Sequence, residues 1–119
     1  MQTNNRDIAS VWDMIRAICY IRAFTENISF EAYLDDIRTV SAVERQFEIL
    51  GEAASRISKE FRQIHSEIDW KRIVGLRNIV SHRYDEVKQE ILWAIIDSEL
   101  DSLLNKLDSL LPPPPNPVK

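Results

Sequence analysis

The first 111 residues of this chain contain no proline, and all five prolines fall between Pro112 and Pro117. Proline removes a backbone donor and interrupts helices, so its absence permits long unbroken helices. Only two glycines are present, which argues against a turn-rich β-sandwich and against a glycine-rich nucleotide-binding loop. The chain has 119 residues, of which 45% are hydrophobic and 29% charged. We therefore expect one globular domain over residues 1–111 and an extended, flexible proline-rich tail over residues 112–119.

Apolar residues recur at intervals of three and four along nearly the whole domain, and no segment alternates with period two for long. This spacing predicts a short helix at Phe30–Leu34 and four main helices, over about Arg6–Phe24, Val40–Phe61, Trp70–Val80 and Asp85–Leu111. The polar residues 62–69 are expected to form a connection that exposes His65. The predicted fold is all-α, an antiparallel four-helix up-and-down bundle with a short extra helix and a proline-rich C-terminal tail.

The same spacing predicts which residues face the core. In the first helix the expected apolar side consists of Ile8, Val11, Trp12, Ile15, Ile18 and Cys19. Cys19 on this side is expected to be a buried small hydrophobic residue. The second helix carries a seam over six turns, formed by Val40, Val43, Phe47, Leu50, Ala54, Ile57 and Phe61. In the last helix the repeat consists of Trp93, Ile96, Leu100, Leu103, Leu107 and Leu110.

Composition excludes several kinds of site. A single cysteine cannot form an internal disulfide, and one cysteine with two histidines cannot supply a structural zinc site of the usual kind. Glu44, Glu48 and Glu52 form a carboxylate row of the type found in bundle enzymes with paired metals. Those enzymes also need a glutamate three residues before a histidine, and neither histidine has one. No metal or other cofactor is therefore expected.

The location and charge of the chain limit its partners. Residues 1–7 are polar with no apolar stretch directly behind them, and no apolar run approaches the roughly 18 residues that a membrane-spanning helix needs. We expect a cytoplasmic protein without membrane contact. The net charge of −4 provides no global attraction to nucleic acid, so any such contact must come from a local patch.

A basic segment lies between Trp70 and Tyr84, where WKRIVGLRNIVSHRY contains four cations and no acid. The other eleven basic and nineteen acidic residues leave −8 on the rest of the chain, so this +4 is locally concentrated. One interpretation is a solvated helix face whose cations pair with acids of a neighbouring helix. The other is a phosphate-binding surface that uses Lys71, Arg72, Arg77 and Arg83.

Two residues of this segment suit reactions at phosphorus. The planar guanidinium of Arg77 offers two parallel donors to a phosphate and stays charged at any working pH. A histidine such as His82 can accept or donate a proton during attack on phosphorus. Cleavage of RNA needs a base for the ribose 2′-hydroxyl and a cation for the charge that develops at phosphorus, and in principle needs no metal. The simpler interpretation of His82 is a surface or helix-capping residue.

Helix geometry restricts how these residues can cooperate. Five positions separate Arg77 from His82, so on a continuous helix they project roughly 140° apart. Asn78 and His82 share one face, and Arg77 and Tyr84 share another. Either the helix ends or bends near His82, or the site uses residues of two chains. A two-fold dimer would bring two copies of the segment together.

The run RNIVSHRY resembles the R-N-x-x-x-H-x-Y signature of HEPN proteins of the HepT type. A second block, AVERQFEILGEAASRIS from Ala42 to Ser58, is similar to the second-helix pattern of that family, including its Gly-Glu-Ala at Gly51–Ala53. The resemblance extends from about Arg6 to Leu107. It implies a HEPN-like bundle, a homodimer whose motifs meet at the interface, and metal-independent endoribonuclease activity on RNA, with tRNA as the expected substrate. It also implies a minimal nucleotidyltransferase antitoxin, as in HepT–MntA pairs, so that the chain would be the toxin of a type VII-like pair.

Four residues receive roles from this resemblance. Arg77 would hold the scissile phosphate and His82 would be the acid/base residue. Asn78 would orient the substrate or His82. Tyr84 matches the position whose hydroxyl the partner enzyme modifies with AMP. Each added phosphodiester would place negative charge and bulk beside Arg77, in competition with RNA.

Two further residues are candidates by position. Glu52 lies in the second family block, where it would support the Arg77 and His82 site, and it is also spaced for an ion pair with Arg56. Arg83 stands where a smaller or acidic residue is common in the family. This difference is expected to affect substrate preference or docking of the antitoxin.

A different class of function fits the same residues. The chain would then be a non-catalytic dimeric helical module that binds a nucleotide or presents a substrate to a partner nucleotidyltransferase. In that case the basic segment binds phosphate without breaking a bond. A homodimer is the expected assembly under both hypotheses, and a higher oligomer is left open.

Overall fold

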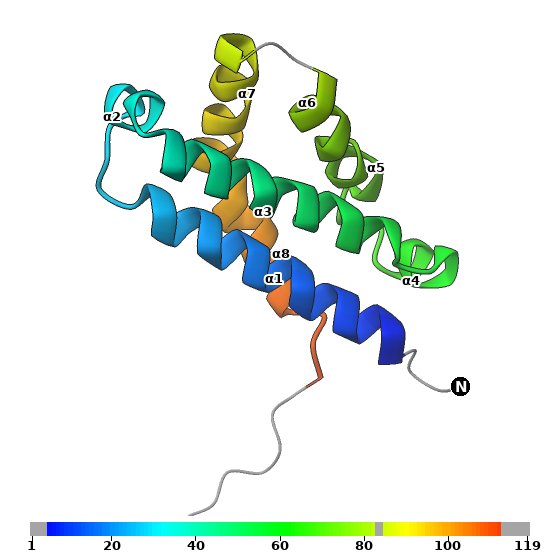
Figure 1. Cartoon of the computed structure of the whole chain (residues 1–119). Helices are drawn as coiled ribbons and strands as arrows, with labels where there is room; N and C mark the ends of the chain where they lie inside the picture. The colour runs from blue at the N-terminus through cyan, green and yellow to red at the C-terminus, as the bar shows by residue number, and fades with distance from the viewer. Residues whose placement is uncertain (1–4, 83–84, 113–119) are drawn as a thin grey trace, which may run out of the picture.

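The computed structural model describes residues 5–82 and 85–112, without the side chains of His82, Asp85 and Glu86. This part of the chain contains helices and no strand (Figure 1). In chain order the helices are α1 (Asn5–Thr25), α2 (Phe30–Asp35), α3 (Ile37–Ser55), α4 (Lys59–Ile64), α5 (Trp70–Val74), α6 (Leu76–His82), α7 (Asp85–Ser98) and α8 (Leu100–Asp108). The predicted all-α bundle is confirmed.

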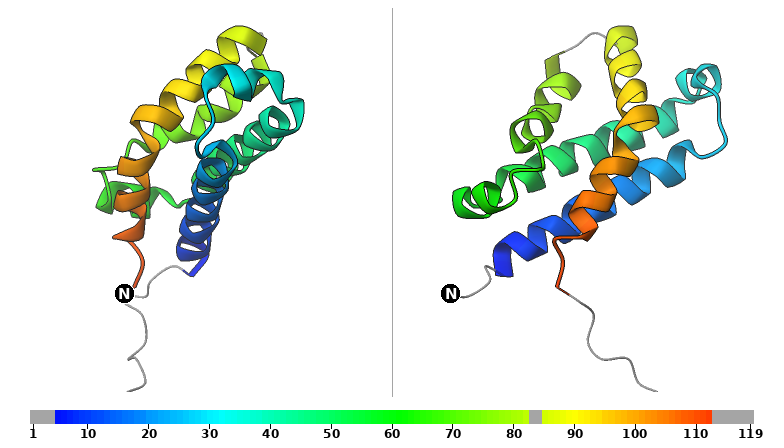
Figure 2. Two further views of the ribbon diagram at one scale, coloured as in Figure 1. Left: turned by 90° about the vertical axis from the view of Figure 1, so that its left-hand side faces the viewer. Right: turned by 180° about the vertical axis from the view of Figure 1, so that it is seen from behind.

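The helices form two antiparallel hairpins in two layers. α1 and α3 lie side by side in one layer, while α5–α6 and α7–α8 form the second layer and cross the first at a steep angle (Figures 1 and 2). α3 packs on α1, α2, α5 and α6, and α8 packs on α1. Because α3 touches elements of both layers, it is the helix against which the basic segment is placed.

Side-chain caps explain where several helices begin. Ser29, Asp36, Ser58 and Asp69 stand directly before α2, α3, α4 and α5, and each accepts a hydrogen bond from a backbone N–H of the first turn. Asp36 also accepts from the hydroxyl of Thr39, and the hydrogen bonds from Thr39 hold the pKa of Asp36 below its usual value. Its contribution to stability is therefore present above the ordinary pKa of aspartate and is lost as the pH falls through the lowered value.

The second long helix is shorter than the sequence predicts. It was expected to run to Phe61, but α3 ends at Ser55 and a separate helix, α4, follows. The guanidinium of Arg62 donates to the carbonyls of Ala54 and Ile57, at 2.9 and 3.2 Å, and so satisfies acceptors that a helix end leaves open. All seven residues of the predicted seam are nevertheless buried.

The break after α3 is fixed by a buried acid from α1. The carboxylate of Asp7, 1% exposed, accepts from the backbone N–H and the hydroxyl of Ser58, both at 2.7 Å. Ser58 in turn caps α4 by accepting from the N–H of Phe61. This contact joins the start of the chain to the turn between α3 and α4.

Replacing Asp7 by alanine should lower the free energy of unfolding by about 2 kcal/mol, because it strands a buried N–H and a hydroxyl. Urea denaturation followed by circular dichroism measures the change. Asp13→Ala is the matched control, since this acid of α1 only forms surface ion pairs with Arg16 and Arg56 and should cost under about 1 kcal/mol. Equal effects of the two substitutions would contradict the role given to Asp7.

The predicted last helix is divided in two. The backbone at Glu99 leaves helical values, with φ −125° and ψ −28°, between α7 and α8, and α8 ends at Asp108, before Pro112. The carboxylate of Glu99 is held by Arg72 of α5 through bonds of 2.9 and 2.6 Å. The break therefore coincides with an interaction between residues that are far apart in the sequence.

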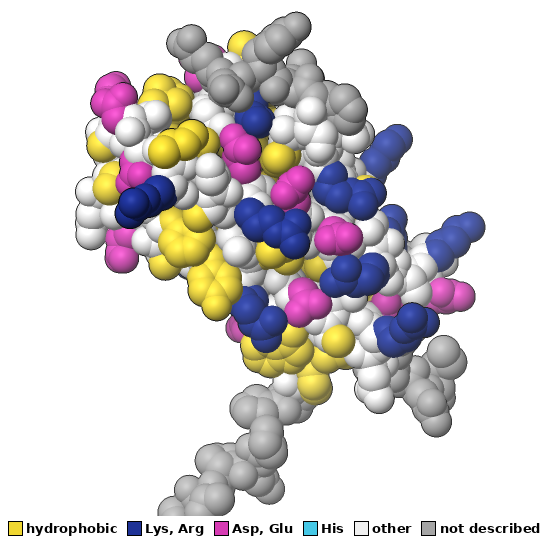
Figure 3. All heavy atoms as spheres, in the orientation of Figure 1, with side chains coloured by type: hydrophobic (Ala, Val, Ile, Leu, Met, Phe, Trp, Pro, Cys, Tyr) yellow, Lys and Arg dark blue, Asp and Glu magenta, His cyan; other side chains and the backbone are white. Residues whose placement is uncertain are grey.

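The predicted apolar side of α1 is correct only in part. Val11 and Ile18 are fully buried, but Trp12 is 50% exposed and Cys19 is exposed, so the expectation of a buried cysteine is wrong. Trp12 and Cys19 each follow a buried residue by one position, which turns them about 100° away from α3. α1 carries apolar residues on more than one side, and only the packing partner decides which side is buried. Space-filling spheres show hydrophobic side chains gathered over α1 between alternating charges (Figure 3).

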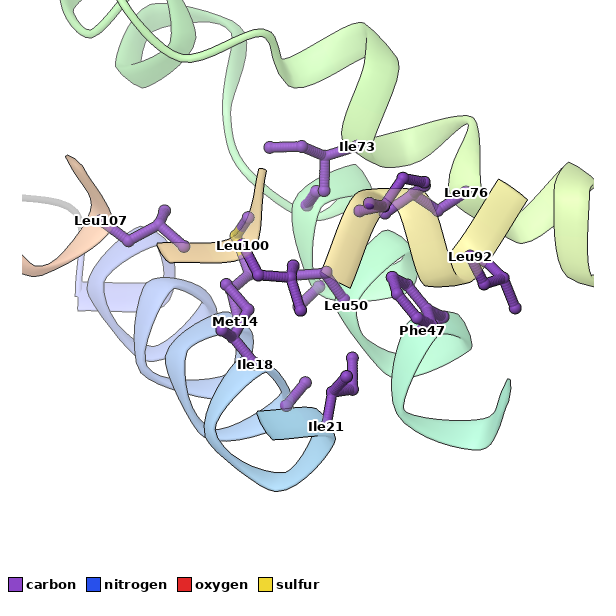
Figure 4. Close-up of a cluster of buried hydrophobic side chains, with 14 of the residues drawn as sticks. Met14, Ile18, Ile21, Phe47, Leu50, Ile73, Leu76, Leu92, Leu100 and Leu107 are labelled. Carbon is purple, nitrogen blue, oxygen red and sulfur yellow. The ribbon is translucent and has the colours of Figure 1, made fainter. Parts of the chain in front are cut away.

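The core lies where the two layers meet. Leucine and isoleucine side chains from α1, α3, α5, α6, α7 and α8 converge there together with Met14 and Phe47 (Figure 4). In α7, Leu92 and Ile95 are buried, while the predicted Trp93 and Ile96 stand one position later and are partly buried. The core thus anchors both helices that flank residues 83–84.

The polar segment 62–69 is more ordered than a plain connection. Its start belongs to α4, and His65, expected to be exposed, is half-buried with its ring centroid 4.4 Å from that of Phe61. The indole N–H of Trp70 donates to the carbonyl of His65 at 3.0 Å. Aromatic packing from the next helix therefore covers a segment whose own sequence looks exposed.

Two further predictions concern membrane-spanning helices and the proline-rich tail. No helix of the described residues is both long and apolar enough to cross a membrane. Of the proline-rich tail predicted over residues 112–119, all but Pro112 lie outside the described residues, so the tail stays a prediction.

Candidate active site

The core fixes the direction in which α6 presents its polar residues. Leu76 and Val80 of α6 are buried, and Leu76 belongs to the same cluster as Phe47 and Leu92 (Figure 4). Arg77 and Asn78 therefore face outward, and both are exposed. The candidate phosphate-binding arginine lies on an open surface, accessible to a macromolecule.

Gly51 of α3 makes room for Arg77. A Cβ atom on Gly51 would lie 2.7 Å from Cγ of Arg77 and 3.2 Å from the carbonyl oxygen of Ile73. Such a contact cannot exist without movement of α3, of α6 or of the arginine. Glycine costs about 1 kcal/mol inside a helix, so its presence in the middle of α3 fits this close approach. The sequence contains Gly51 in its second family block, but nothing in the sequence indicates that it touches Arg77.

Replacing Gly51 by alanine should displace Arg77 and reduce about tenfold or more any activity in which Arg77 takes part, because displacement of a functional group by about 1 Å is enough for losses of this order. Initial rates on a labelled RNA, the substrate that the sequence resemblance implies, measure the effect. Gly75→Ala is the matched control, since its Cβ would meet only two carbonyl oxygens, at 3.3 and 3.4 Å. If both variants were as active as the wild type, Gly51 would have no part in placing Arg77.

The cations of the basic segment have different surroundings. Arg72 is held by both carboxylate oxygens of Glu99, and these hydrogen bonds raise the pKa of Arg72 above its usual value. For Arg72 the interpretation as a cation paired with a neighbouring helix is therefore correct. Arg77, in contrast, forms no ion pair with any carboxylate whose side chain the structure describes. Within the described part of the segment, Arg77 is the guanidinium without a carboxylate partner.

The remaining candidates of the signature lie at or beyond the end of α6. His82 is the last residue of α6, and its side chain is not described. Arg83 and Tyr84 lie outside the described residues. Arg77 and His82 are on one helix, five positions apart, which separates their directions by about 140° and their heights by about 7.5 Å. One copy of α6 does not by itself bring both side chains to one face.

The carboxylate row of α3 is engaged mainly in structural contacts. Glu44 accepts from Lys88 and Gln89 of α7, and Glu48 pairs with Arg45 at 3.6 Å. Glu52 is exposed and follows Gly51 directly, and the suggested partner of Glu52, Arg56, pairs instead with Asp13. Across the described residues, no three His, Cys, Asp or Glu side chains are grouped to hold a metal ion.

A hollow lies beside the basic segment, between α5 and α7–α8. Its lining includes Arg72, Leu76, Glu99 and Lys106 but not Arg77. The candidate site at Arg77 and Asn78 is therefore separate from this hollow. The exposed surface around Arg77 and Asn78 suits a polymer that lies along it.

Comparisons with known proteins find a family of ribonucleases. The model of a family described as "Ribonuclease HepT-like" matches residues 14–110, which include both Gly51 and the whole segment from Arg77 to Tyr84. A protein of Thermococcus cleftensis named "Probable ribonuclease HepT" is 37% identical over 98 residues, covering 82% of this chain and 89% of that protein. A protein of Methanocaldococcus jannaschii named as a "Putative RNase" is 29% identical over 106 residues, 88% of this chain and 97% of that protein.

A third relative, from Caldanaerobacter subterraneus and also named as a "Putative RNase", is 37% identical over 86 residues, covering 72% of this chain and 77% of that protein. No solved structure gives a significant match. The family match covers most of the domain, and the relatives match it over most of their own length. Arg77, which faces outward and packs on Gly51, lies within the matched residues. The chain belongs to the HepT-like family of ribonucleases.

Proposed function

We propose that this chain is the toxin of a type VII-like toxin–antitoxin pair and acts as a metal-independent endoribonuclease. Arg77 holds the scissile phosphate and His82 is the acid/base residue, with Asn78, Glu52 and Arg83 in supporting positions. The observation that carries the proposal is the exposed guanidinium of Arg77. Cγ of Arg77 packs on Gly51, and the guanidinium has no described carboxylate partner, in the helix that ends at His82.

The chemistry follows from these two groups. His82 in its neutral form removes the proton of the ribose 2′-hydroxyl, and the oxygen attacks the adjacent phosphorus. The bond to the 5′-oxygen breaks, and a protonated acid returns a proton to that leaving oxygen. The products are a 2′,3′-cyclic phosphate and a 5′-hydroxyl. The fork of Arg77 stabilises the charge that develops on the phosphoryl oxygens.

A homodimer supplies what one copy lacks. Arg77 and His82 diverge on one α6, so a single copy does not bring both side chains to one phosphate. Two copies of α6 related by a two-fold axis would place the arginine of one beside the histidine of the other. The substrate proposed is tRNA in the cytoplasm, and the homodimer is the proposed active assembly.

The proposal is tested with purified chain and end-labelled tRNA in buffer containing EDTA. We expect cleavage by the wild type and products with cyclic phosphate ends. The double variant with Arg77→Ala and His82→Ala, purified in parallel, controls for contaminating nuclease. If the wild type and the double variant cleave equally, these residues have no part in the activity. Tight binding of nucleotide or RNA without cleavage would favour the non-catalytic module.

Control by a partner is proposed to act on Tyr84. A minimal nucleotidyltransferase would add AMP to its hydroxyl, and the added phosphodiester would compete with RNA for Arg77. Incubation with ATP and the partner should increase the mass of the Tyr84 peptide by one or more AMP units and reduce RNA cleavage. A Tyr84→Phe chain that the partner still inhibits fully would contradict this assignment.

A further inference from the structure

A largely buried polar cluster joins three helices beside the end of α6. Its members are Tyr33 of α2, Glu44 of α3, and Lys88 and Gln89 of α7. The phenol of Tyr33 donates to the side-chain oxygen of Gln89, whose amide donates to Glu44. The ammonium of Lys88 lies 3.2 Å from the same Glu44 carboxylate. Tyr33 is fully buried, and Lys88 and Gln89 are 8% and 3% exposed.

One bond of this cluster reaches α6. Nζ of Lys88 donates to the carbonyl oxygen of Val80 at 3.3 Å. Val80 is among the last four residues of α6, whose carbonyls have no donor within the helix. A cation at this end of a helix is also favoured by the helix dipole. Lys88 therefore closes the C-terminal end of α6 two residues before His82.

The cluster is arranged to hold Lys88 in one position. Glu44 fixes the ammonium, Gln89 fixes Glu44, and Tyr33 fixes Gln89. Burial, and secondarily the charge of Glu44, raise the pKa of Tyr33 well above its usual value, so its hydroxyl remains a donor. The side chains of Lys88 and Glu44 are 10% and 23% exposed, and a largely buried ion pair of this kind adds little stability compared with an apolar pair of similar size. The geometry that the pair enforces is therefore the better explanation for it.

The location of the cluster fits a role at the candidate site. α6 packs mainly on α3, while α7 returns from residues 83–84 beside α2 (Figures 1 and 2). The bond from Lys88 to Val80 ties α6 directly to α7 at the point where the chain passes between them. A shift of this carbonyl would move the main chain of His82.

We propose that Lys88, held by Glu44 and Gln89, is a positioning residue of the nuclease that fixes the end of α6 and with it His82. This inference rests on the acid/base role proposed for His82. Lys88 acts on the last turn of α6 through the Val80 carbonyl, and it need not touch RNA.

The test compares Lys88→Met with Lys106→Met in steady-state cleavage of tRNA. Lys106 also donates to a backbone carbonyl, that of Glu67 at 3.4 Å, but it joins α8 to the segment between α4 and α5 and not to the end of α6. We expect kcat to fall about ten- to a hundredfold for Lys88→Met with KM changed less than about twofold, and neither constant to change for Lys106→Met. Melting temperatures of both variants are recorded with the rates.

The double variant Glu44→Leu with Lys88→Met separates positioning from stability. It replaces the ion pair by apolar side chains, which should restore the melting temperature, but it cannot restore the bond to Val80. Low kcat in this well-folded variant supports positioning. A kcat equal to that of an active wild type overturns it.

A spectroscopic experiment tests the same inference and does not depend on nuclease activity. The chain contains two histidines, so ring NMR spectra of histidine-labelled protein give one set of signals each for His82 and His65, assigned with His65→Gln. Lys88→Met should shift the signals of His82 and leave those of His65 in place. If the His82 signals move but the wild type cleaves no RNA, the proposed function fails while the positioning role stands. Unmoved His82 signals overturn the positioning role.

Discussion

Replacing His82 by alanine should lower the rate of tRNA cleavage by about 10²–10⁴-fold, which corresponds to about 3–5 kcal/mol of transition-state stabilisation. Alanine cannot remove the proton of the 2′-hydroxyl, so water must do so. Because the substrate still meets Arg77, KM should change much less than kcat. Single-turnover cleavage with enzyme in excess measures the chemical step directly.

His65→Gln is the control for His82→Ala. His65 is the other histidine of the chain, packed on Phe61, and it lies in the segment between α4 and α5. We expect its substitution to change the cleavage rate by less than about twofold, because its ring packs on Phe61 of α4 and not on α6. Equal losses in both variants would show that His82 acts through folding alone and would remove it from the reaction.

Replacing Arg77 by alanine should lower kcat/KM by about 10²–10³-fold, because a preorganised donor to the developing phosphoryl charge is lost. Arg77→Lys should recover only part of this, since an ammonium keeps the charge but cannot form two parallel bonds. The dependence of RNA affinity on salt should also weaken in Arg77→Ala, because one phosphate contact is missing. Cleavage rates and filter binding at several salt concentrations measure both effects.

Arg45→Ala is the control for Arg77→Ala, because Arg45 is an exposed arginine of α3 that pairs with Glu48. We expect full activity from it. Should Arg77→Ala retain the wild-type rate while Arg45→Ala lost it, the phosphate site would lie elsewhere on the surface.

Mixing the two inactive chains tests whether the site is shared. If Arg77 of one copy works with His82 of the other, a mixed dimer of Arg77→Ala and His82→Ala contains one intact site. A random equal mixture should then recover about a quarter of the wild-type activity, because half of the dimers are mixed and each has one of two sites. If both residues came from the same chain, no site would be intact and the mixture would remain inactive.

Much of the fold was predictable from local signals. The absence of proline before Pro112 and the three-four apolar repeat predicted the all-α bundle, and α1 lies within one residue of the predicted bounds at each end. The seam from Val40 to Phe61 is buried throughout. These features depend on helix geometry and on apolar spacing, which are properties of neighbouring residues.

The errors in the fold have a common cause. α3 ends early because Asp7 of α1 holds Ser58 in the turn that follows, and α7 ends directly before Glu99, which Arg72 holds. Cys19 is exposed because α3 packs on the adjacent side of α1. In each case the decisive partner is distant in sequence, so no local pattern contains it.

For the candidate site, the sequence alone determined the residue types and their order: an acid-free basic segment that contains Arg77 and His82, and the resemblance that the family match confirms. Only the tertiary structure decided that Arg77 packs on Gly51 and that Arg72 pairs with Glu99. It also decided that Lys88, paired with Glu44, donates to a backbone carbonyl at the end of α6. The physical reason is that spacing along a helix fixes the direction of a side chain. Its charge environment depends instead on which other helix the core packs against it.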